Sequence, residues 1–211
     1  MKQNLYWRSL FFFTGIVLLS LGIALIIQGQ AIGVGSWDVL HIGLAQTLGL
    51  TIGSWSILIG LFILAIDGIV RKRLPRIGTY LDMFLAGIFI DLFNWMLPTF
   101  DGLGPQILAY IAGLLLLGFG CGMYMVADLG VGPRDTLMLL IVQKFGWTFG
   151  RARTVMEVSV AIVGFVLGGP VGVGTVLMAF LLGPIVQWAL GVNQKLYKYA
   201  TGAESLLLET N

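Results

Sequence analysis

Charged residues are scarce in this sequence. Asp, Glu, Lys and Arg together make up 10% of the 211 residues, whereas 58% are hydrophobic. A water-soluble domain has about 25% charged residues, so this chain lacks the polar surface that would let it face water on all sides. The sequence therefore predicts an all-α polytopic membrane protein in contact with the lipid bilayer. The net charge is only +2, and no basic cluster is interleaved with aromatic residues, which argues against nucleic-acid binding.

The residues used for most metal sites and covalent chemistry are also scarce. Cys121 is the only cysteine and His41 the only histidine. An internal disulfide is therefore excluded, and a metal site lacks ligands. Neither a His-Glu-x-x-His nor a Gly-x-Ser-x-Gly motif occurs. We expect a protein without enzymatic activity, without a cofactor and without a bound metal.

Long apolar runs are abundant instead. Six segments approach the roughly 20 mainly apolar residues that a helix needs to cross a bilayer: about 9–28, 53–70, 79–97, 106–127, 153–169 and 173–191. Two further helical stretches, 36–48 and 133–145, are too short to cross. The first segment has no small-x-small cleavage site after it, so it is expected to be a retained span and not a signal peptide.

The distribution of positive charge selects one topology. If the two short stretches re-enter the membrane without crossing it, all twelve Lys and Arg residues fall on one side. The positive-inside rule assigns that side to the cytoplasm. The prediction is six transmembrane helices plus two re-entrant half-helices, with both termini in the cytoplasm.

The chain also contains an internal repeat. Residues 33–53 match residues 130–150 at nine of 21 positions, and residues 78–87 match residues 174–183 at six of ten. Each copy has three crossings and one half-helix. Because three is an odd number, the second copy has the opposite orientation, which is the inverted-topology duplication found in many transporters.

We therefore expect a single membrane domain over residues 1–191. Repeat 1 covers about 9–97 and repeat 2 about 106–191, followed by a short cytoplasmic tail, 192–211. In each repeat a Gly-Val-Gly loop precedes a half-helix, and the two half-helix N-termini should face each other near the bilayer centre. Free N–H groups at a helix start, together with the helix dipole, attract negative groups.

The motifs "GVGSWD" and "GVGPRD", each after an apolar span, and the later "GT..L..FL.G" helix resemble the YczE/YyaS/YitT family of bacterial integral membrane proteins. The resemblance covers about residues 9–191. It implies a bacterial cytoplasmic (inner) membrane protein. YitT-type members carry a soluble C-terminal domain, for which the tail here is too short, so the chain is most similar to the YczE-like branch.

Polar residues of the half-helices form the candidate site. Asp38 and Asp135 would either cap the helices or bind an ion or proton. Arg134 would either be neutralised by Asp135 or hold an anionic group of the solute, and its counterpart Trp37 would supply an apolar or cation–π wall. His41 is either a packed side chain or a proton carrier. The complete candidate set for solute or ion binding is Gly33, Gly35, Trp37, Asp38, His41, Asp91, Gly130, Gly132, Arg134 and Asp135.

Other acidic residues have expectations of their own. Asp91 lies well inside the third span, where it either lines a polar path or makes a hydrogen bond between helices. Asp67 and Asp82 flank the basic "RKRLPR" segment and are expected to balance its charge at the membrane interface. Glu157 lies one helical turn from two arginines and is expected to form a local ion pair there.

These features predict a bacterial inner-membrane transporter or channel for a small anionic or zwitterionic solute, bound where the two half-helices meet. The alternative is a non-transporting accessory or regulatory protein that stabilises a membrane partner. A homo-oligomer is compatible with either. Water or glycerol conduction is disfavoured because the Asn-Pro-Ala signature is absent and each re-entrant element follows the first span of its repeat.

Overall fold

The structure of the protein is a computed structural model that describes residues 2–201, except for the side chains of residues 2–4 and 149. The described chain consists of helices joined by short loops: α1 (Lys2–Gln28), the 3-10 turn η1 (Gln30–Ile32), α2 (Ser36–Leu48), α3 (Ile52–Arg71), α4 (Ile77–Met96), α5 (Leu103–Val126), α6 (Pro133–Phe145), α7 (Phe149–Val166) and α8 (Val173–Thr201). The all-α prediction is thereby confirmed for the described residues, and the helices are consistent with a polytopic membrane protein.

Five of these helices, α1, α3, α4, α5 and α8, are long and apolar enough to cross a membrane. The sixth predicted crossing, α7, has 18 residues and carries Arg151, Arg153 and Glu157. The helices α2 and α6 have 13 residues each, which gives a length of about 20 Å and leaves them too short to span. A glycine stands on either side of both short helices, so their predicted limits coincide with the observed ones.

The last helix is longer than expected. The segment predicted to be a tail from residue 192 continues α8 as far as Thr201, and residues 202–211 lie outside the described part. Packing explains the extension. The Asn193 amide donates hydrogen bonds to the carbonyl oxygens of Ala189 (2.9 Å) and Phe119 (3.4 Å). The ring of Tyr197 lies 5.2 Å from that of Phe11.

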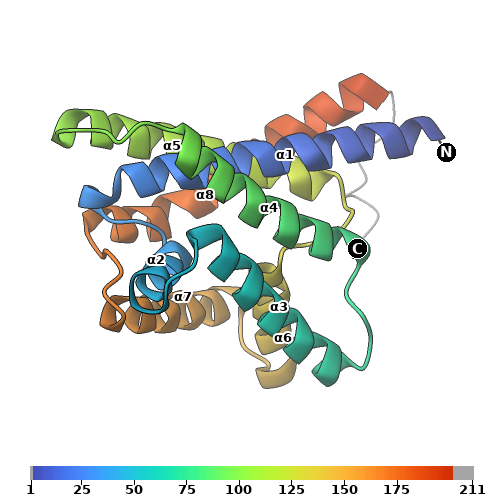
Figure 1. The fold of residues 1–211 in the computed structure, drawn as a ribbon. Helices are drawn as coiled ribbons and strands as arrows, with labels where there is room; N and C mark the ends of the chain where they lie inside the picture. Colours follow the sequence, from blue (N-terminus) through green and yellow to red (C-terminus); the bar gives the residue numbers. More distant parts are fainter. Residues whose placement is uncertain (1, 202–211) are drawn as a thin grey trace.

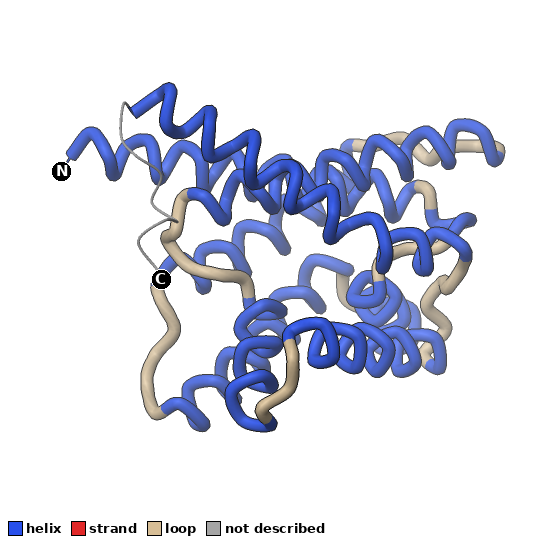
Figure 2. Tube along the Cα trace, turned by 180° about the vertical axis from the view of Figure 1, so that it is seen from behind, coloured by secondary structure: helices blue, strands red, loops and turns tan. Residues whose placement is uncertain are grey.

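The helices form two layers (Figures 1 and 2). One layer contains α1, α4, α5 and α8, and we call it the scaffold layer. The other contains α2, α3, α6 and α7, and we call it the half-helix layer. Among residues 2–201, the only extensive helix–helix packing between the layers is that of α3 on α4.

Two glycine-containing helices hold the scaffold layer together. A methyl group on Gly22 of α1 would come within 2.7 Å of the carbonyl oxygen of Gly113 in α5, and one on Gly120 of α5 would come equally close to the carbonyl oxygen of Gly15. Such close approach is possible only where side chains are absent from both helices. These glycines are therefore the packing surface that joins α1 to α5.

Each Gly-Val-Gly loop packs on the start of a helix from the other repeat. Gly33 lies against Gly172 and Thr175 at the start of α8, and Gly130 lies against Gly78 and Thr79 at the start of α4. Gly33 has φ +109°, a conformation that side chains strongly disfavour. A duplicated unit would give this reciprocal arrangement. The duplication itself stays a prediction.

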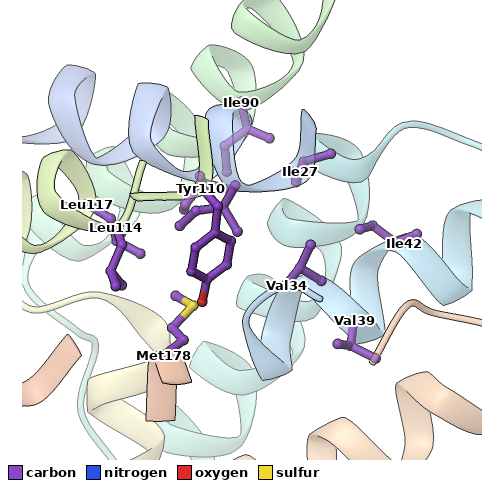
Figure 3. Packing of buried hydrophobic residues seen from close by; sticks show 11 residues of the cluster. Ile27, Val34, Val39, Ile42, Ile90, Tyr110, Leu114, Leu117 and Met178 are labelled. Carbon is purple, nitrogen blue, oxygen red and sulfur yellow. The ribbon is translucent and has the colours of Figure 1, made fainter. Parts of the chain in front are cut away.

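The apolar core lies around the first of these loops (Figure 3). Val34 from the loop, Ile90 from α4 and Met178 from α8 surround Tyr110 of α5. The Tyr110 hydroxyl donates a hydrogen bond to the carbonyl oxygen of Gly174, at 2.5 Å. This core fixes the loop, and with it the start of α2, against the scaffold layer.

The connecting loops lie at two opposite ends of the bundle. The N-terminus and the α3–α4 loop are at one end, whereas the α4–α5 and α7–α8 loops are at the other (Figure 1). The first end carries the basic segment Arg71–Arg76, and the two loops at the second end contain neither Lys nor Arg. We call the first of these the basic end.

Candidate functional site

The starts of the two half-helices face a single cavity between the layers. Its volume is about 590 Å³, and its lining combines apolar side chains with several ionisable ones. That volume is within the range of small-molecule sites. Seven of the predicted site residues line it: Gly35, Trp37, Asp38, His41, Gly132, Arg134 and Asp135.

Arg134 connects the two half-helices across the cavity. Its guanidinium lies 3.7 Å from Oδ1 of Asp38 and 5.3 Å from the centre of the Trp37 ring. The interpretation in which Arg134 is simply neutralised by its neighbour Asp135 does not match this geometry. The predicted cation–π contact between Trp37 and a positive group exists, but the group is Arg134 itself.

Asp38 is buried and accepts no hydrogen bond from the described residues. Asp38 lies in the first turn of α2, but neither of its carboxylate oxygens accepts a hydrogen bond from the N–H groups of that turn. The nearest cation, Arg134, lies 3.7 Å from Asp38 and makes no hydrogen bond to it. Burying a carboxylate in this way is costly unless another group pairs with it. Asp38 is therefore a group that can bind a further positive charge or a hydrogen-bond donor.

A second acidic cluster surrounds the start of α6. Asp135 accepts a hydrogen bond from the Tyr124 hydroxyl at 3.1 Å. A methyl group on Gly132 would lie 2.9 Å from Oδ2 of Asp82 and 3.7 Å from that same hydroxyl. Two carboxylates and a tyrosine from three helices thus converge on one half-helix N-terminus.

The prediction for Asp82 was wrong. Asp82 does not balance the charge of the basic segment. It is buried in α4, lines the cavity, and its Oδ1 accepts no hydrogen bond from the described residues. A usable signal was present in the repeat, because Met178 takes the equivalent position in α8. A carboxylate at a position where the matching helix has a methionine was a signal that could have singled out Asp82.

His41 and Trp37 add further polar atoms to the cavity. Both side chains are buried, and neither Nδ1 of His41 nor Nε1 of Trp37 has a hydrogen-bond partner among the described residues. Their rings are 6.5 Å apart. These atoms are available to a solute in the cavity.

Three predicted site residues lie elsewhere. Asp91 does not line the cavity, because its Oδ1 accepts a hydrogen bond from the N–H of Gly53 (2.8 Å) and Oδ2 accepts one from the Thr51 hydroxyl. Asp91 therefore stabilises the start of α3, which was the structural alternative. Gly33 and Gly130 pack on the starts of α8 and α4 and are also outside the lining.

The remaining acidic residues divide between the interface and the cavity. Asp67 pairs with Arg71 at 2.6 Å, as charge balance requires. Glu157 and Arg153 of α7 line the cavity. Glu157 forms no ion pair within 4.0 Å among the described residues, so its expected local pair with the arginines is absent there. The part of the chain that the structure describes also holds no group of three residues suited to a metal ion.

Comparison with known proteins places this architecture in a family. Residues 6–190 match the family described as "Family of unknown function (DUF6198)". The chain belongs to this family. It is 39% identical to "Uncharacterized membrane protein YczE" of Bacillus subtilis over 211 residues, which is 100% of this chain and 98% of the relative. The predicted resemblance to YczE is thereby confirmed.

Two more distant relatives also align over most of their length. An "Uncharacterized protein" of Haemophilus influenzae is 34% identical over 194 residues, covering 90% of this chain and 88% of the relative. "Uncharacterized protein YyaS" of Bacillus subtilis is 31% identical over 182 residues, covering 85% and 90%. No solved structure matches the chain.

Proposed function

We propose that the protein transports a small zwitterionic solute across the bacterial inner membrane, and that the solute binds in the cavity between the two layers. The observation that carries the proposal is the convergence of both half-helix N-termini on one cavity of about 590 Å³. Irregular backbone at membrane depth is tolerated where it lines such a cavity, and transporters place their sites there.

The charges of the lining favour a zwitterion over a simple anion. Four acidic residues line the cavity, Asp38, Asp82, Asp135 and Glu157, against two arginines, Arg134 and Arg153. An anion alone would meet more negative than positive groups. A zwitterion can place its negative group at a half-helix N-terminus near Arg134 and its ammonium beside Asp82 and Asp135.

The proposed topology follows the distribution of charge. Six helices cross the membrane, α2 and α6 re-enter it, and the basic end of the bundle faces the cytoplasm with both termini. The supporting observation is that the N-terminus and the basic α3–α4 loop lie together, opposite the α4–α5 and α7–α8 loops, which contain neither Lys nor Arg (Figure 1).

A thermal-shift screen of the purified protein tests the proposal. The panel contains the twenty amino acids, glycine betaine and taurine as zwitterions, acetate, phosphate and sulfate as anions, and choline and ethylamine as cations. A ligand at about 100 times its Kd should stabilise the protein by roughly 2.7 kcal/mol. We expect a zwitterion to raise Tm and the simple ions to have no effect.

Two cavity variants and one control locate the binding. Asp82→Asn should abolish the shift by removing the carboxylate next to the ammonium, and Arg134→Gln should abolish it by removing the positive group. Asp101→Asn, in the exposed α4–α5 loop, should retain it. Uptake of the same compound into proteoliposomes then follows transport directly. If no compound changes Tm, the accessory-protein alternative takes precedence, and the search moves to membrane partners.

A further inference from the structure

The two repeats differ at one helix pair. In repeat 1, α3 and α4 are in close contact. A methyl group on Gly53 of α3 would collide with the carbonyl oxygen of Gly87 in α4, and one on Gly87 would lie 2.8 Å from the carbonyl oxygen of Gly53. The backbones of α3 and α4 therefore meet at this glycine pair, and the cavity is closed on this side.

The equivalent glycines of repeat 2 are present but do not meet. Gly150 of α7 and Gly183 of α8 match Gly53 and Gly87 in the repeat, and a methyl group on either would touch nothing within 4 Å. Among residues 2–201, α7 and α8 do not pack as α3 and α4 do. Two cavity-lining residues, Val158 of α7 and Phe180 of α8, are 52% and 74% exposed. The cavity therefore opens between α7 and α8.

The side chains facing this opening complement each other in size. In the closed pair, the side chain of Met83 in α4 fills the space beside Gly60 in α3. In the open pair the equivalent residues are Glu157 of α7 and Ala179 of α8. The large residue is therefore on the first helix of this pair and the small one on the second, the reverse of the closed pair. A contact between α7 and α8 would again join a large side chain to a small one.

The hydrogen bonds between the two helices of the closed pair, which we call the lock, also have a counterpart in the open pair. Asp91 of α4 binds the Thr51 hydroxyl and the Gly53 N–H at the start of α3. The equivalent residues are Gln187 of α8, which is exposed, and Thr148, which caps α7 by accepting a hydrogen bond from the N–H of Arg151. The amide of Gln187 has the chemistry to bond to the start of α7 if the helices come together.

The connections between the layers allow such a movement. Apart from α3 on α4, the half-helix layer is attached mainly by the two Gly-Val-Gly loops, which pack on the starts of α8 and α4. Each loop thus joins the half-helix layer to the start of one scaffold helix, and the layer could rotate about these two contacts. Pro184 follows Gly183 inside α8, and a proline removes one backbone hydrogen bond and permits a bend there.

We infer that the protein is an alternating-access carrier: in a second state α7 and α8 close through Gly150 and Gly183, and α3 and α4 separate. In the described state the cavity is open between α7 and α8 and closed between α3 and α4. The second state has the opposite access. Since an inverted repeat gives the two states equivalent contacts, one sequence supports both.

Disulfide cross-linking tests the second state. The single native cysteine is removed by Cys121→Ala, and cysteine pairs are placed at the two locks: Thr51→Cys with Asp91→Cys, and Thr148→Cys with Gln187→Cys. The repeat 1 pair should cross-link because these side chains are hydrogen-bonded. The repeat 2 pair should also cross-link, and in the four-cysteine protein each molecule should contain one disulfide or the other, not both.

A blocking variant separates closure from loss of folding. A Cβ atom added at Gly183 meets nothing within 4 Å in the described state, and the position is exposed. We therefore expect Gly183→Leu to keep the elution profile and the repeat 1 cross-link. The same leucine would collide with Gly150 in the second state, and the repeat 2 cross-link should be lost. If the repeat 2 pair never cross-links in folded protein, or if Gly183→Leu leaves that cross-link unchanged, the inference is wrong.

The inference names the transport mechanism of the proposed function, but its test needs no solute. Cross-linking at both locks without any Tm shift in the compound panel would support the movement and contradict the zwitterion site. A zwitterion that shifts Tm without repeat 2 cross-linking would support the site and contradict the carrier.

Discussion

Several cavity side chains are buried at a cost to stability. Asp38 is 1% and Asp82 7% exposed, and Asp82 lies near a second carboxylate, Asp135, around the same helix start. Burying a carboxylate without hydrogen bonds is unfavourable. Residues retained under that cost are usually functional in membrane proteins. These buried carboxylates thus lower the stability of the protein at the site where we propose that the solute binds.

Asp82→Asn should therefore not destabilise the protein. The substitution removes a buried negative charge and keeps nearly the same shape, so the free energy of unfolding should stay the same or rise by up to about 1 kcal/mol. Thermal unfolding in detergent measures the change. The control is Asp67→Asn, which loses the 2.6 Å pair with Arg71 and should lower Tm. A large loss of stability in Asp82→Asn would mean that Asp82 has a structural partner.

At the scale of helices, contacts between glycines determine which helices can move. The α1–α5 contact has backbone against backbone at Gly15, Gly22, Gly113 and Gly120. Dispersion forces are strong at such short separations, and in lipid they are a main source of helix association. The α1–α5 pair is therefore tightly packed, and we expect it to move least.

Gly22→Ala should separate α1 from α5. The added methyl would lie 2.7 Å from the carbonyl oxygen of Gly113, and overpacking of this kind costs about 1–3 kcal/mol. We expect a lower Tm and a lower yield of monodisperse protein. In Gly191→Ala, the matched control in α8, the methyl touches nothing within 4 Å, and stability should stay equal or improve. Equal Tm for both variants would show that the glycine contact is not tight.

The sequence predicted elements better than it predicted their contacts. Flanking glycines marked both short helices at their observed ends, because glycine ends a helix for local reasons. Of the contacts between distant segments, the sequence predicted only the meeting of the two half-helix N-termini, and that prediction came from the repeat. Asp82 was misplaced because it is close to the basic segment in the sequence, and this was taken to mean that it is close in space. Helix α4 instead directs its side chain toward the cavity. The partner of Arg134 was misassigned for the same reason, since Asp38 lies 96 residues away.

For the whole molecule, the topology can be measured with single cysteines in the Cys121→Ala background. With six crossings, a membrane-impermeant maleimide should label Leu50→Cys and Asp101→Cys in intact cells, and Lys72→Cys only after permeabilisation. All three sites are exposed. If α2 and α6 cross the membrane, the pattern reverses at all three positions. The Leu50 result is the most informative, because Leu50 directly follows the first half-helix.

The lock on the start of α3 also has a thermodynamic consequence. Asp91 is charged and short, whereas its counterpart Gln187 is neutral and longer, so the same role is filled by unequal groups. A good capping interaction contributes about 1 kcal/mol, and 1.4 kcal/mol is tenfold in an equilibrium constant. The resting population should therefore favour the state with α3 closed by several-fold. Exchanging the two residues, Asp91→Gln with Gln187→Asp, should invert that ratio, which distances between spin labels on α7 and α8 would reveal. A single carboxylate would thus determine which of the two states the empty protein mainly occupies.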